Sequence, residues 1–457
     1  MIGGGISGLA AAHRLQQAGA TVTLVERSGR LGGIVETTIE DGFVIEGGPD
    51  SFVTGKGSVL QLAEELGLSP EVIPTRSDVG GSHVWWDGRL HPLPGGLLLM
   101  VPSRLGPLLG SSLLSWRGKT RVLADLVLPR AGGTEDESLG SFVRRRLGSE
   151  VLERIAEPLI AGIHAAEPET MSLVASFPRF LEMEAEHRSL ILAARRSASR
   201  IASEARSHFS SFRLGMSQLT MALAGGLGRV KVRTHTSVTA IDRSGLGRYV
   251  ASLEDGSKIA ASAVVVATPA PVAAGLLERL APGAAGKLSE ISQVGTTAVT
   301  LAYQSNQIPH LHGSGFVVPS TTGRRIRGVS YLSRKWEGRV PHSGYELIRV
   351  FFGAGRTVDQ PVQTARRELA ATAGITAEPD RVWVRDHPYG LHRYTLGHPE
   401  RVTSVERSLM SCPGVAVAGA GLHGVGLNEC VMSGCQAAEL ALDAVGRSTV
   451  SSGDRSR

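Results

Sequence analysis

The residues best suited to chemistry stand at the N-terminus, where a glycine pattern precedes a helix-forming stretch. Residues 3–8 read GGGISG, a GxGxxG pattern, and the β-branched stretch at 21–25 is followed by Glu26. Such glycines allow a sharp turn and bring backbone N–H groups to a pyrophosphate at a helix N-terminus. An acidic residue about 20 positions further on accepts hydrogen bonds from ribose hydroxyls. The pattern predicts a dinucleotide-binding βαβ unit, with contacts from Gly3, Gly4, Gly5, Ile6, Ser7, Gly8, Glu26 and the adjacent Arg27.

The strand that should precede this motif is short. Only Met1 and Ile2 come before Gly3, whereas a typical strand has about five residues. We therefore expect that the chain either starts late or carries a truncated domain. A shortened first strand would weaken the affinity for the cofactor, but it does not change the identity of the motif.

Two further glycine turns bear on which dinucleotide is bound. An RLGG turn at 30–33 follows Glu26, and residues 46–51 read EGGPDS. An Arg-x-Gly-Gly at this place resembles the second signature of FAD-containing oxidases, although either turn alone also fits a surface loop. Together and in this order they favour FAD over NAD. The expected contacts are Arg30, Gly33, Gly48, Pro49, Asp50 and Ser51.

A second GxGxxG stands at residues 419–424, after a predicted strand at 415–418. A reductase with two nucleotide sites would use it for NAD(P)H. The chain ends at residue 457, too soon for another βαβ unit with its acidic residue. We therefore expect this segment to complete the FAD site, with a helix starting near residue 425 whose N-terminal amides face the flavin. The expected contacts are Gly424, Val425, Gly426 and Leu427.

The central chain adds shorter elements to this pattern. A strand is predicted over 236–241, where Val238 is a further expected cofactor contact, and a hairpin turn follows at 254–256. The apolar run at 263–266 predicts a buried strand, and residues 189–207 predict a helix. These elements suit a nucleotide-binding domain assembled from separate parts of the chain.

Composition limits the class of protein. The chain has 457 residues, of which 42% are apolar and 20% charged, so it predicts a globular protein of two or three packed units. Three cysteines, Cys412, Cys430 and Cys435, form neither a disulfide framework nor a CxxC metal site, which favours a cytoplasmic location. The net charge of +6 shows no basic stripe with aromatics, so nucleic acid is not an expected partner. We find no signal peptide or membrane-spanning run.

The order of motifs over essentially the whole chain resembles one family. The matching segments include EGGPDSF at 46–52, SLGSFVRRRLG at 138–148, EHRSLI at 186–191, YTLGH at 394–398 and GVGLNEC at 424–430. On these segments the chain resembles the FAD-dependent porphyrinogen oxidases of haem synthesis. The resemblance implies an α/β fold with a discontinuous Rossmann-like FAD-binding domain and inserted helical and mixed-sheet substrate domains.

The resemblance also implies the reaction. A porphyrinogen would lose six electrons in three two-electron steps, with oxygen as the acceptor and hydrogen peroxide as the second product. The flavin N5 of non-covalently bound FAD would do the chemistry, so we assign no catalytic acid or base and no metal. The implied partners are the porphyrinogen and oxygen, with direct transfer to a downstream haem-pathway enzyme left open.

The family contains a type that forms coproporphyrin III and a type that forms protoporphyrin IX. Residues 96–103 and 313–318 resemble the first type, as does Lys56, so we favour coproporphyrinogen III, with protoporphyrinogen IX second. Coproporphyrinogen III has four carboxylates, so its site should offer more cationic contacts than a site for protoporphyrinogen IX, which has two. The cationic candidates are Lys56, Arg325, Arg327, Arg334 and Lys335; the expected substrate contacts are Lys56, Gly162, Ser314, Gly315, Val317, His392 and Arg393.

Two departures from the family pattern leave alternatives open. The family usually has Pro-Gln where His392-Arg393 stands, and Asp where Glu429 stands. The His-Arg pair would bind a propionate, alter flavin reactivity or mark a diverged substrate, or it lies in an exposed loop. Two further readings are a related FAD amine oxidase or desaturase, and a catalytically impaired FAD-binding porphyrin carrier.

Three other features carry structural expectations. The run Arg144-Arg145-Arg146 predicts a helix face or a patch for an acidic partner, and His187 is predicted to be a hydrogen-bonded structural histidine. Cys430 is expected to be a buried thiol. The apolar residues 97–101 and their neighbours favour cavity and core over a membrane contact, which would be peripheral at most.

The expected domain organisation follows from the placement of these motifs. The FAD-binding domain comprises residues 1–80, 205–285 and 380–446, the helical substrate or lid domain residues 81–204, the substrate-domain sheet residues 286–379, and a disordered tail residues 447–457.

Overall fold

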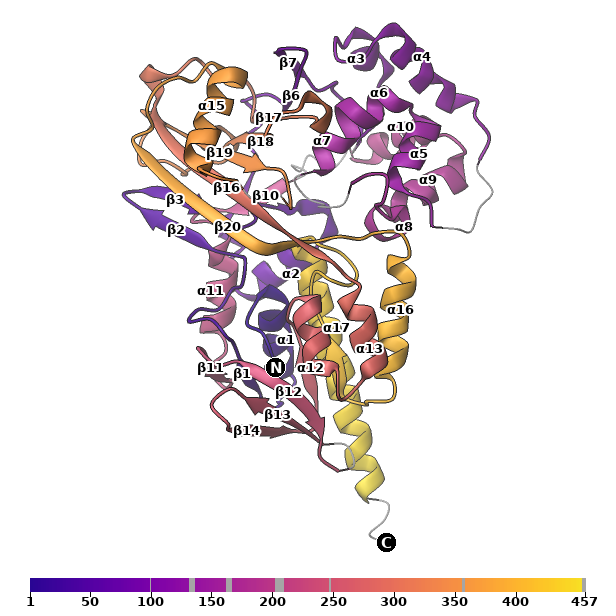
Figure 1. Cartoon of the computed structure of the whole chain (residues 1–457), viewed down its shortest axis with the longest axis vertical. Helices are drawn as coiled ribbons and strands as arrows, with labels where there is room; N and C mark the ends of the chain where they lie inside the picture. The colour runs from indigo at the N-terminus through magenta and orange to yellow at the C-terminus, as the bar shows by residue number, and fades with distance from the viewer. Residues whose placement is uncertain are drawn as a thin grey trace.

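The computed structural model describes residues 1–453, apart from residues 99, 131–135, 162–166, 202–208, 246–247 and 356–357. Its elements form three groups (Figure 1). A lower group holds the N-terminal motif and the C-terminal helix, an upper group is built on one large sheet, and a second upper group is helical.

The lower group is built on a parallel layer in which the first strand is reduced to two residues. Ile2 bridges Val25 on one side and Val266 on the other, both in parallel orientation. The Ile2 N–H donates to Val265 O at 2.9 Å, and the Val25 N–H donates to Met1 O at 2.9 Å. Met1 and Ile2 thus make the backbone pairing expected of a first strand. The layer comprises β1 (Thr23–Val25), β11 (Lys231–Arg233), β15 (Val264–Val266) and β21 (Val415–Val417).

Helices pack on this layer and bury its apolar face. Helix α1 (Ile6–Gln17) packs along the long helix α17 (Leu427–Gly453), and both helices contact strands of the layer. Gly434 permits their close crossing, because a Cβ there would lie 2.1 Å from Ser7 O. The other helices of this group are α2 (Ser58–Glu65), α11 (Ser217–Gly225), α12 (Ala270–Leu277), α13 (Pro282–Ser289) and α16 (His398–Leu409).

Small antiparallel sheets complete the lower group and join it to the upper ones. The predicted hairpin is confirmed: residues 254–256 connect two of the three strands β12, β13 and β14. The bounds are β2 (Thr37–Glu40), β3 (Phe43–Glu46), β4 (Phe52–Val53), β5 (Val72–Pro74), β10 (Phe209–Phe212), β12 (Val238–Arg243), β13 (Tyr249–Leu253) and β14 (Lys258–Ala261).

The large sheet has seven strands in the order β20-β16-β19-β18-β17-β6-β7. Strands β6 and β7 come from the segment expected to belong to the helical unit, but they extend this sheet. The bounds are β6 (His83–Trp86), β7 (Arg89–Pro92), β16 (Gln293–Gln304), β17 (Gly315–Val317), β18 (Ile326–Tyr331), α14 (Leu332–Lys335), β19 (Tyr345–Phe352), α15 (Pro361–Ala373) and β20 (Arg381–His392).

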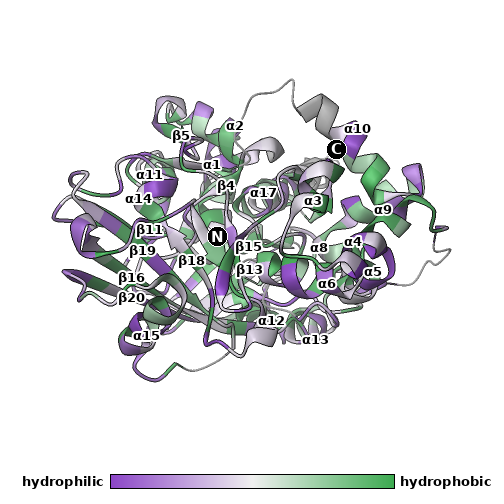
Figure 2. Ribbon diagram, turned by 90° about the horizontal axis from the view of Figure 1, so that it is seen from above, coloured by the Kyte–Doolittle hydropathy of each residue, from purple (hydrophilic) through white to green (hydrophobic). Residues whose placement is uncertain are grey.

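The helical group has an apolar core of its own. Its elements are β8 (Leu97–Leu98), β9 (Val101–Pro102), α3 (Leu105–Gly110), α4 (Trp116–Leu123), α5 (Leu139–Arg146), α6 (Ser149–Val151), α7 (Glu157–Ile160), α8 (Leu173–Ser176), α9 (Pro178–His187) and α10 (Leu190–Ile201). Viewed from above, hydrophilic residues lie mainly on outer turns and hydrophobic residues on central elements (Figure 2).

Two further findings concern the chain as described. Helix α17 continues to Gly453, into the segment expected as a disordered tail. Within the described ranges, no helix is both long enough and apolar enough to cross a bilayer.

Candidate active site

The N-terminal glycines form a tight turn that ends at the start of α1. Gly3 has φ +97°, and a Cβ on Gly8 would lie 2.0 Å from Gly3 O, so neither position accommodates a larger residue. Gly5 is the N-cap of α1; no side chain caps the helix and no acidic residue occupies its first turn. This leaves the positive end of the helix dipole to an anionic ligand, at Ile6 and Ser7.

The acidic residue of the motif lies at the glycine turn, as its spacing predicts. The Gly4 N–H donates to Glu26 Oε2 at 2.7 Å, and the Ser28 N–H donates to Glu26 Oε1 at 2.8 Å. The adjacent Arg27 is exposed. These two hydrogen bonds hold the Glu26 carboxylate beside the turn.

The RLGG turn packs directly against the N-terminal motif. Gly5 and Gly32 form a parallel bridge, and a Cβ on Gly33 would lie 3.0 Å from Gly5 Cα. Arg30 holds this turn, because its Nη2 donates to Gly33 O at 2.7 Å and to Glu36 Oε2 at 3.0 Å. Two segments predicted separately from sequence therefore form one surface.

The turn at residues 46–51 packs against the same surface and carries a charged residue. A Cβ on Gly48 would lie 1.9 Å from Ile34 O. Beyond Pro49, Asp50 accepts hydrogen bonds from Lys335 Nζ at 3.0 Å and from Ser51 Oγ at 2.7 Å. Burial alone would raise the pKa of Asp50, but Lys335, Ser51 and Arg349 lower it well below its usual range. Asp50 is therefore a carboxylate.

The segment 419–424 meets this site from the other end of the chain. Tyr394 Oη donates to Ala420 O at 2.8 Å and accepts from the Gly424 N–H at 2.8 Å. His398 Nε2 lies 2.8 Å from Leu422 O. Both residues belong to the family motif YTLGH at 394–398, but the motif alone indicates no role for Tyr394 or His398. The buried contacts of these two rings hold the glycine loop.

Helix α17 begins at Leu427, next to this loop and after Val425. Gly424 has φ +149°, and a Cβ on Gly426 would lie 2.3 Å from Glu429 Oε2. Asn428 Oδ1 accepts from the Val59 N–H at 3.0 Å, and its Nδ2 donates to Val53 O at 2.9 Å. The start of α17 is therefore bonded to the chain that follows the turn at 46–51.

Two other predicted residues contribute to this region in different ways. Val238 packs, half-buried, against the apolar cluster that contains Ile2 and Val266. Cys430 is buried, and burial raises the pKa of its thiol to about 12. Cys430 is thus a buried neutral thiol, as predicted.

A cavity of about 200 Å³ lies between α7 and the large sheet. The predicted Ser314, Gly315 and Val317 line it, and Gly315 has φ +138° with no room for a Cβ beside Val329 O. Of the cationic candidates with described side chains, Arg327 and Lys335 line the cavity. The full described lining is Ser82, Pro158, Leu159, Ala161, Thr296, Ser314, Gly315, Phe316, Val317, Arg327, Gly328, Val329, Ser330, Lys335, Phe351, Phe352, Ala354 and Leu391.

The remaining cationic candidates lie elsewhere or cannot be placed. Arg325 is exposed, and Arg334 Nε donates to Gly313 O at 3.2 Å. Gly162 lies outside the described residues. Lys56 ends a short helical turn after β4, but its side chain also lies outside the described part of the structure.

The His392-Arg393 pair is not an exposed loop. His392 is 8% exposed, its Nε2 lies 2.7 Å from Gln293 Nε2, and its ring packs against Gly421. Burial, with a smaller effect of His398, lowers the pKa of His392 to about 4. The neutral ring therefore faces the C-terminal glycine loop. Arg393 is half-buried, and its backbone N–H donates to Ser292 O at 2.9 Å.

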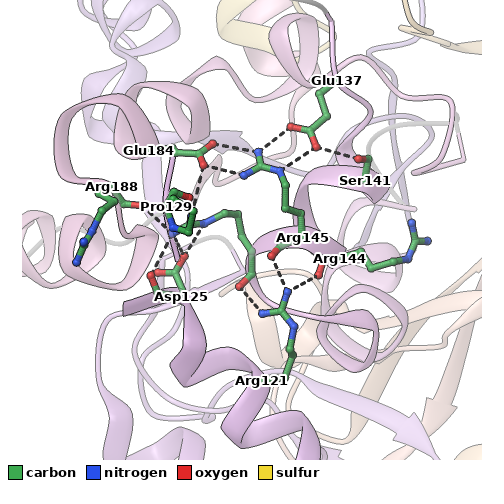
Figure 3. A network of polar contacts seen from close by, with 10 residues as sticks. Arg121, Asp125, Pro129, Glu137, Ser141, Arg144, Arg145, Glu184 and Arg188 are labelled. Atoms are coloured by element: carbon green, nitrogen blue, oxygen red, sulfur yellow. Dashed lines mark hydrogen bonds and ion pairs between the residues drawn. The ribbon is translucent and has the colours of Figure 1, made fainter. Parts of the chain in front are cut away.

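The arginine run occupies the last turn of α5, and its three side chains differ in burial. Arg146 and Asp125 are both fully buried and paired, with Arg146 Nε donating to Asp125 Oδ1 at 2.7 Å. Arg145 binds Glu137 and Glu184, as Figure 3 shows. Only Arg144 is about half exposed. The run ties α5 to its neighbours, because helix periodicity turns consecutive residues towards different surroundings. His187 is hydrogen-bonded as expected, with Nδ1 3.0 Å from Arg196 Nη1.

Comparison with known proteins identifies the family. The family described as "Flavin containing amine oxidoreductase" matches residues 6–442. Coproporphyrinogen III oxidase from Bacillus subtilis is 33% identical and aligns over 97% of each chain. The enzyme of that name from Propionibacterium freudenreichii is 34% identical over 100% of this chain and 92% of its own. The chain belongs to the porphyrinogen oxidase family.

Other members of the family and more distant proteins agree on the fold. Protoporphyrinogen oxidase from Bos taurus is 33% identical over 97% of this chain and 98% of its own. A solved structure assigned to the protoporphyrinogen oxidases, from Exiguobacterium, has a TM-score of 0.84 and 31% identity over 97% of this chain and 98% of its own. Putrescine oxidase shares only the fold, with a TM-score of 0.68 and 16% identity. The predicted amine-oxidase-type α/β fold is confirmed, and membership of this family implies a flavin.

Proposed function

We propose that this protein is an FAD-dependent oxidase that converts coproporphyrinogen III into coproporphyrin III in haem biosynthesis. The observation that carries the proposal is a cavity with two cationic side chains, Arg327 and Lys335, beside segments suited to a dinucleotide. Full-length similarity to coproporphyrinogen III oxidases of Bacillus and Propionibacterium supports the choice of substrate.

The contacts at the glycine turns fit FAD. The uncapped start of α1 would bind the pyrophosphate, and Glu26 would accept hydrogen bonds from the ribose hydroxyls. Gly48 and Gly424, which have no room for a Cβ, belong to the two turns expected to face the isoalloxazine ring. The amides at the start of α17 would also approach that ring. When bound, FAD supplies two-electron redox chemistry between the substrate and oxygen.

The cavity residues would bind and orient the substrate. Guanidinium and ammonium groups form charge-assisted hydrogen bonds with carboxylates, so Arg327 and Lys335 suit propionate side chains. Both side chains also have partners within the protein: Lys335 Nζ donates to Asp50 Oδ2 at 3.0 Å, and Arg327 Nη1 donates to Arg324 O at 2.9 Å. Ser314, Gly315 and Val317 would lie against the macrocycle.

The proposed reaction removes six electrons and six hydrogen atoms from the porphyrinogen and reduces three oxygen molecules to hydrogen peroxide. Among the cavity-lining residues that the structure describes, none carries a carboxylate or an imidazole. We assign no general base, because the cofactor and the aromaticity of the product would drive the proposed reaction. The protein would contribute positioning and electrostatics.

Protoporphyrinogen IX is the second candidate substrate. Its support is the protoporphyrinogen oxidase of Bos taurus, which is as similar in sequence as the Bacillus enzyme. A dicarboxylate would need fewer cationic contacts than the tetracarboxylate. Among the described lining residues, the presence of both Arg327 and Lys335 favours the latter.

Porphyrin fluorescence tests the proposal directly. Purified, FAD-loaded protein would be given each porphyrinogen separately in air, with hydrogen peroxide measured in parallel. Faster formation of coproporphyrin III, with three peroxides per porphyrin, is the expected result. Faster formation of protoporphyrin IX would show that protoporphyrinogen IX, and not coproporphyrinogen III, is the preferred substrate. Bound flavin without oxidation of either would favour the porphyrin-carrier reading, and peroxide formed from amines would favour an amine oxidase.

A further inference from the structure

A buried arginine donates hydrogen bonds to the backbone of the turn at residues 46–51. Arg349 on β19 is 4% exposed, and its Nη1 and Nη2 donate to Gly48 O at 2.8 Å and Gly47 O at 3.2 Å. Its Nε has no hydrogen-bond partner. Among the described residues, no carboxylate lies within ion-pair distance of Arg349. Its hydrogen bonds in the described structure go to backbone carbonyls, its guanidinium carbon lies 4.9 Å from the centre of the Phe351 ring, and the carboxylates of Asp50 and Glu46 act on it from a longer distance.

The charges around Arg349 leave an excess of positive charge. Lys335 Nζ lies 3.0 Å from Asp50 Oδ2, and Arg339 Nη2 lies 3.5 Å from Glu46 Oε1. Each of these carboxylates is thus paired with another cation. Burial raises the pKa of Glu46, and a protonated Glu46 would make the net charge of this group of residues more positive. In a low-dielectric interior such a charge acts strongly on neighbouring groups.

The contacts place this charge where the cofactor segments meet the cavity. The Gly47 N–H donates to Glu36 O at 2.6 Å, and Gly48 packs on Ile34, next to the RLGG turn. A few residues later, Val53 accepts a hydrogen bond from Asn428 at the start of α17. Lys335, bonded to Asp50, lines the cavity. The turn that Arg349 contacts therefore lies beside the RLGG turn, precedes the residue bonded to α17, and is joined to the cavity lining through Asp50 and Lys335.

We propose that Arg349 stabilises the negatively charged, reduced form of the flavin and so raises its reduction potential. The proposal rests on the proposed function only in requiring that FAD is bound. A fixed cation behind a rigid turn is preorganised, so it stabilises added negative charge without moving. Arg349 is thus an electrostatic tuning residue, distinct from the cavity cations assigned to substrate carboxylates.

Sulfite titration of the oxidised, FAD-loaded protein tests this without substrate. Sulfite adds to the oxidised flavin ring and leaves negative charge on it, so its Kd reports the local potential. In Arg349→Met we expect the sulfite Kd to rise at least tenfold, which corresponds to about 30 mV for a two-electron couple. Arg349→Lys, which keeps the charge, should stay within about threefold of wild type. The exposed Arg381 provides the matched control, Arg381→Met, with no change.

A second substitution, which removes a negative charge instead of a positive one, should shift the sulfite Kd in the opposite direction. Asp50→Asn removes negative charge from the same cluster and should lower the sulfite Kd. If Arg349→Met does not fold, Asp50→Asn alone decides, with the potential measured by equilibration with a redox dye as a second readout. Unchanged sulfite affinity and potential in the folded, FAD-bound variants would overturn the proposal while leaving the proposed function intact. A wild-type chain that binds no FAD would overturn both.

Discussion

The phenol ring of Tyr394 stacks on the imidazole of His398, with the ring centroids 3.9 Å apart and the planes at 17°. Each ring also bonds to the backbone of the glycine loop, Tyr394 at Ala420 and Gly424 and His398 at Leu422. The two side chains therefore act as one unit that fixes the loop expected to face the flavin.

Removing the Tyr394 hydroxyl should loosen this loop. Tyr394→Phe keeps the stacked ring but leaves the Ala420 carbonyl and the Gly424 N–H without this partner, at a cost of about 1–3 kcal/mol in the free energy of unfolding. We also expect a weaker affinity for FAD, measured by flavin fluorescence. Tyr389→Phe, at a side chain that is 71% exposed, is the control. Equal values for both variants would contradict the assigned role.

Two buried histidines should make the stability depend on pH. Burial lowers the pKa of His392 and of His398 to about 4, from about 6.5 in the unfolded chain. The unfolded state thus binds more protons between these values. The free energy of unfolding should fall as the pH drops from 6.5 to 4, by up to about 1.4 kcal/mol per pH unit for each histidine. When the free energy of unfolding is measured in urea at several pH values, it should depend less steeply on pH in His398→Gln than in the wild type. The same dependence on pH in both proteins would contradict this prediction.

The buried pair in the helical group should be sensitive to loss of one partner. Arg146→Met leaves the buried Asp125 charge uncompensated and should cost about 3–5 kcal/mol in urea unfolding. Arg144→Met, on the same helix at a half-exposed site, should cost less than about 1 kcal/mol. The double variant Arg146→Met with Asp125→Leu should recover part of the loss. A small effect of Arg146→Met alone would contradict the buried-pair assignment.

A methyl group in the N-terminal turn should prevent cofactor binding. The Cβ of Gly8→Ala would lie 2.0 Å from Gly3 O, so the turn or α1 must shift. We expect the purified variant to retain less than about a tenth of the flavin absorbance, a loss of more than about 1.4 kcal/mol in binding. Gly228→Ala, where the added methyl group has no neighbour within 4 Å, should retain it fully.

The cavity arginine should discriminate between the two porphyrinogens. Charged hydrogen bonds contribute about 1.5–3 kcal/mol, so Arg327→Met should raise the KM for coproporphyrinogen III about tenfold or more. Protoporphyrinogen IX, with two carboxylates fewer, should be affected less. The neighbouring Arg325→Met changes an exposed side chain and serves as the control. Equal effects of Arg327→Met on both substrates would remove Arg327 from the carboxylate site.

The parts of the site that sequence patterns predicted are those built from local contacts. Glu26 and the glycines at 3–8 lie within one short segment, so their spacing along the chain determines their geometry. Tyr394 belongs to a motif, but the sequence indicates no role for it, because its partner loop is formed by later residues. The sequence gives no sign of the position of Arg349, because nothing near it along the chain marks it as buried against residues 47–48.

The sequence by itself determined the glycine turn before α1, the order of the glycine-containing segments and the family, since each depends on residue types at fixed short spacings. Only the tertiary structure decided that Arg146 is buried while Arg144 is half exposed, that His392 faces the glycine loop, and that Arg349 lies behind the turn at 46–51. Burial and charge pairing depend on which distant segments pack together. Long-range packing is set by the whole chain and leaves no periodic signal at a single residue.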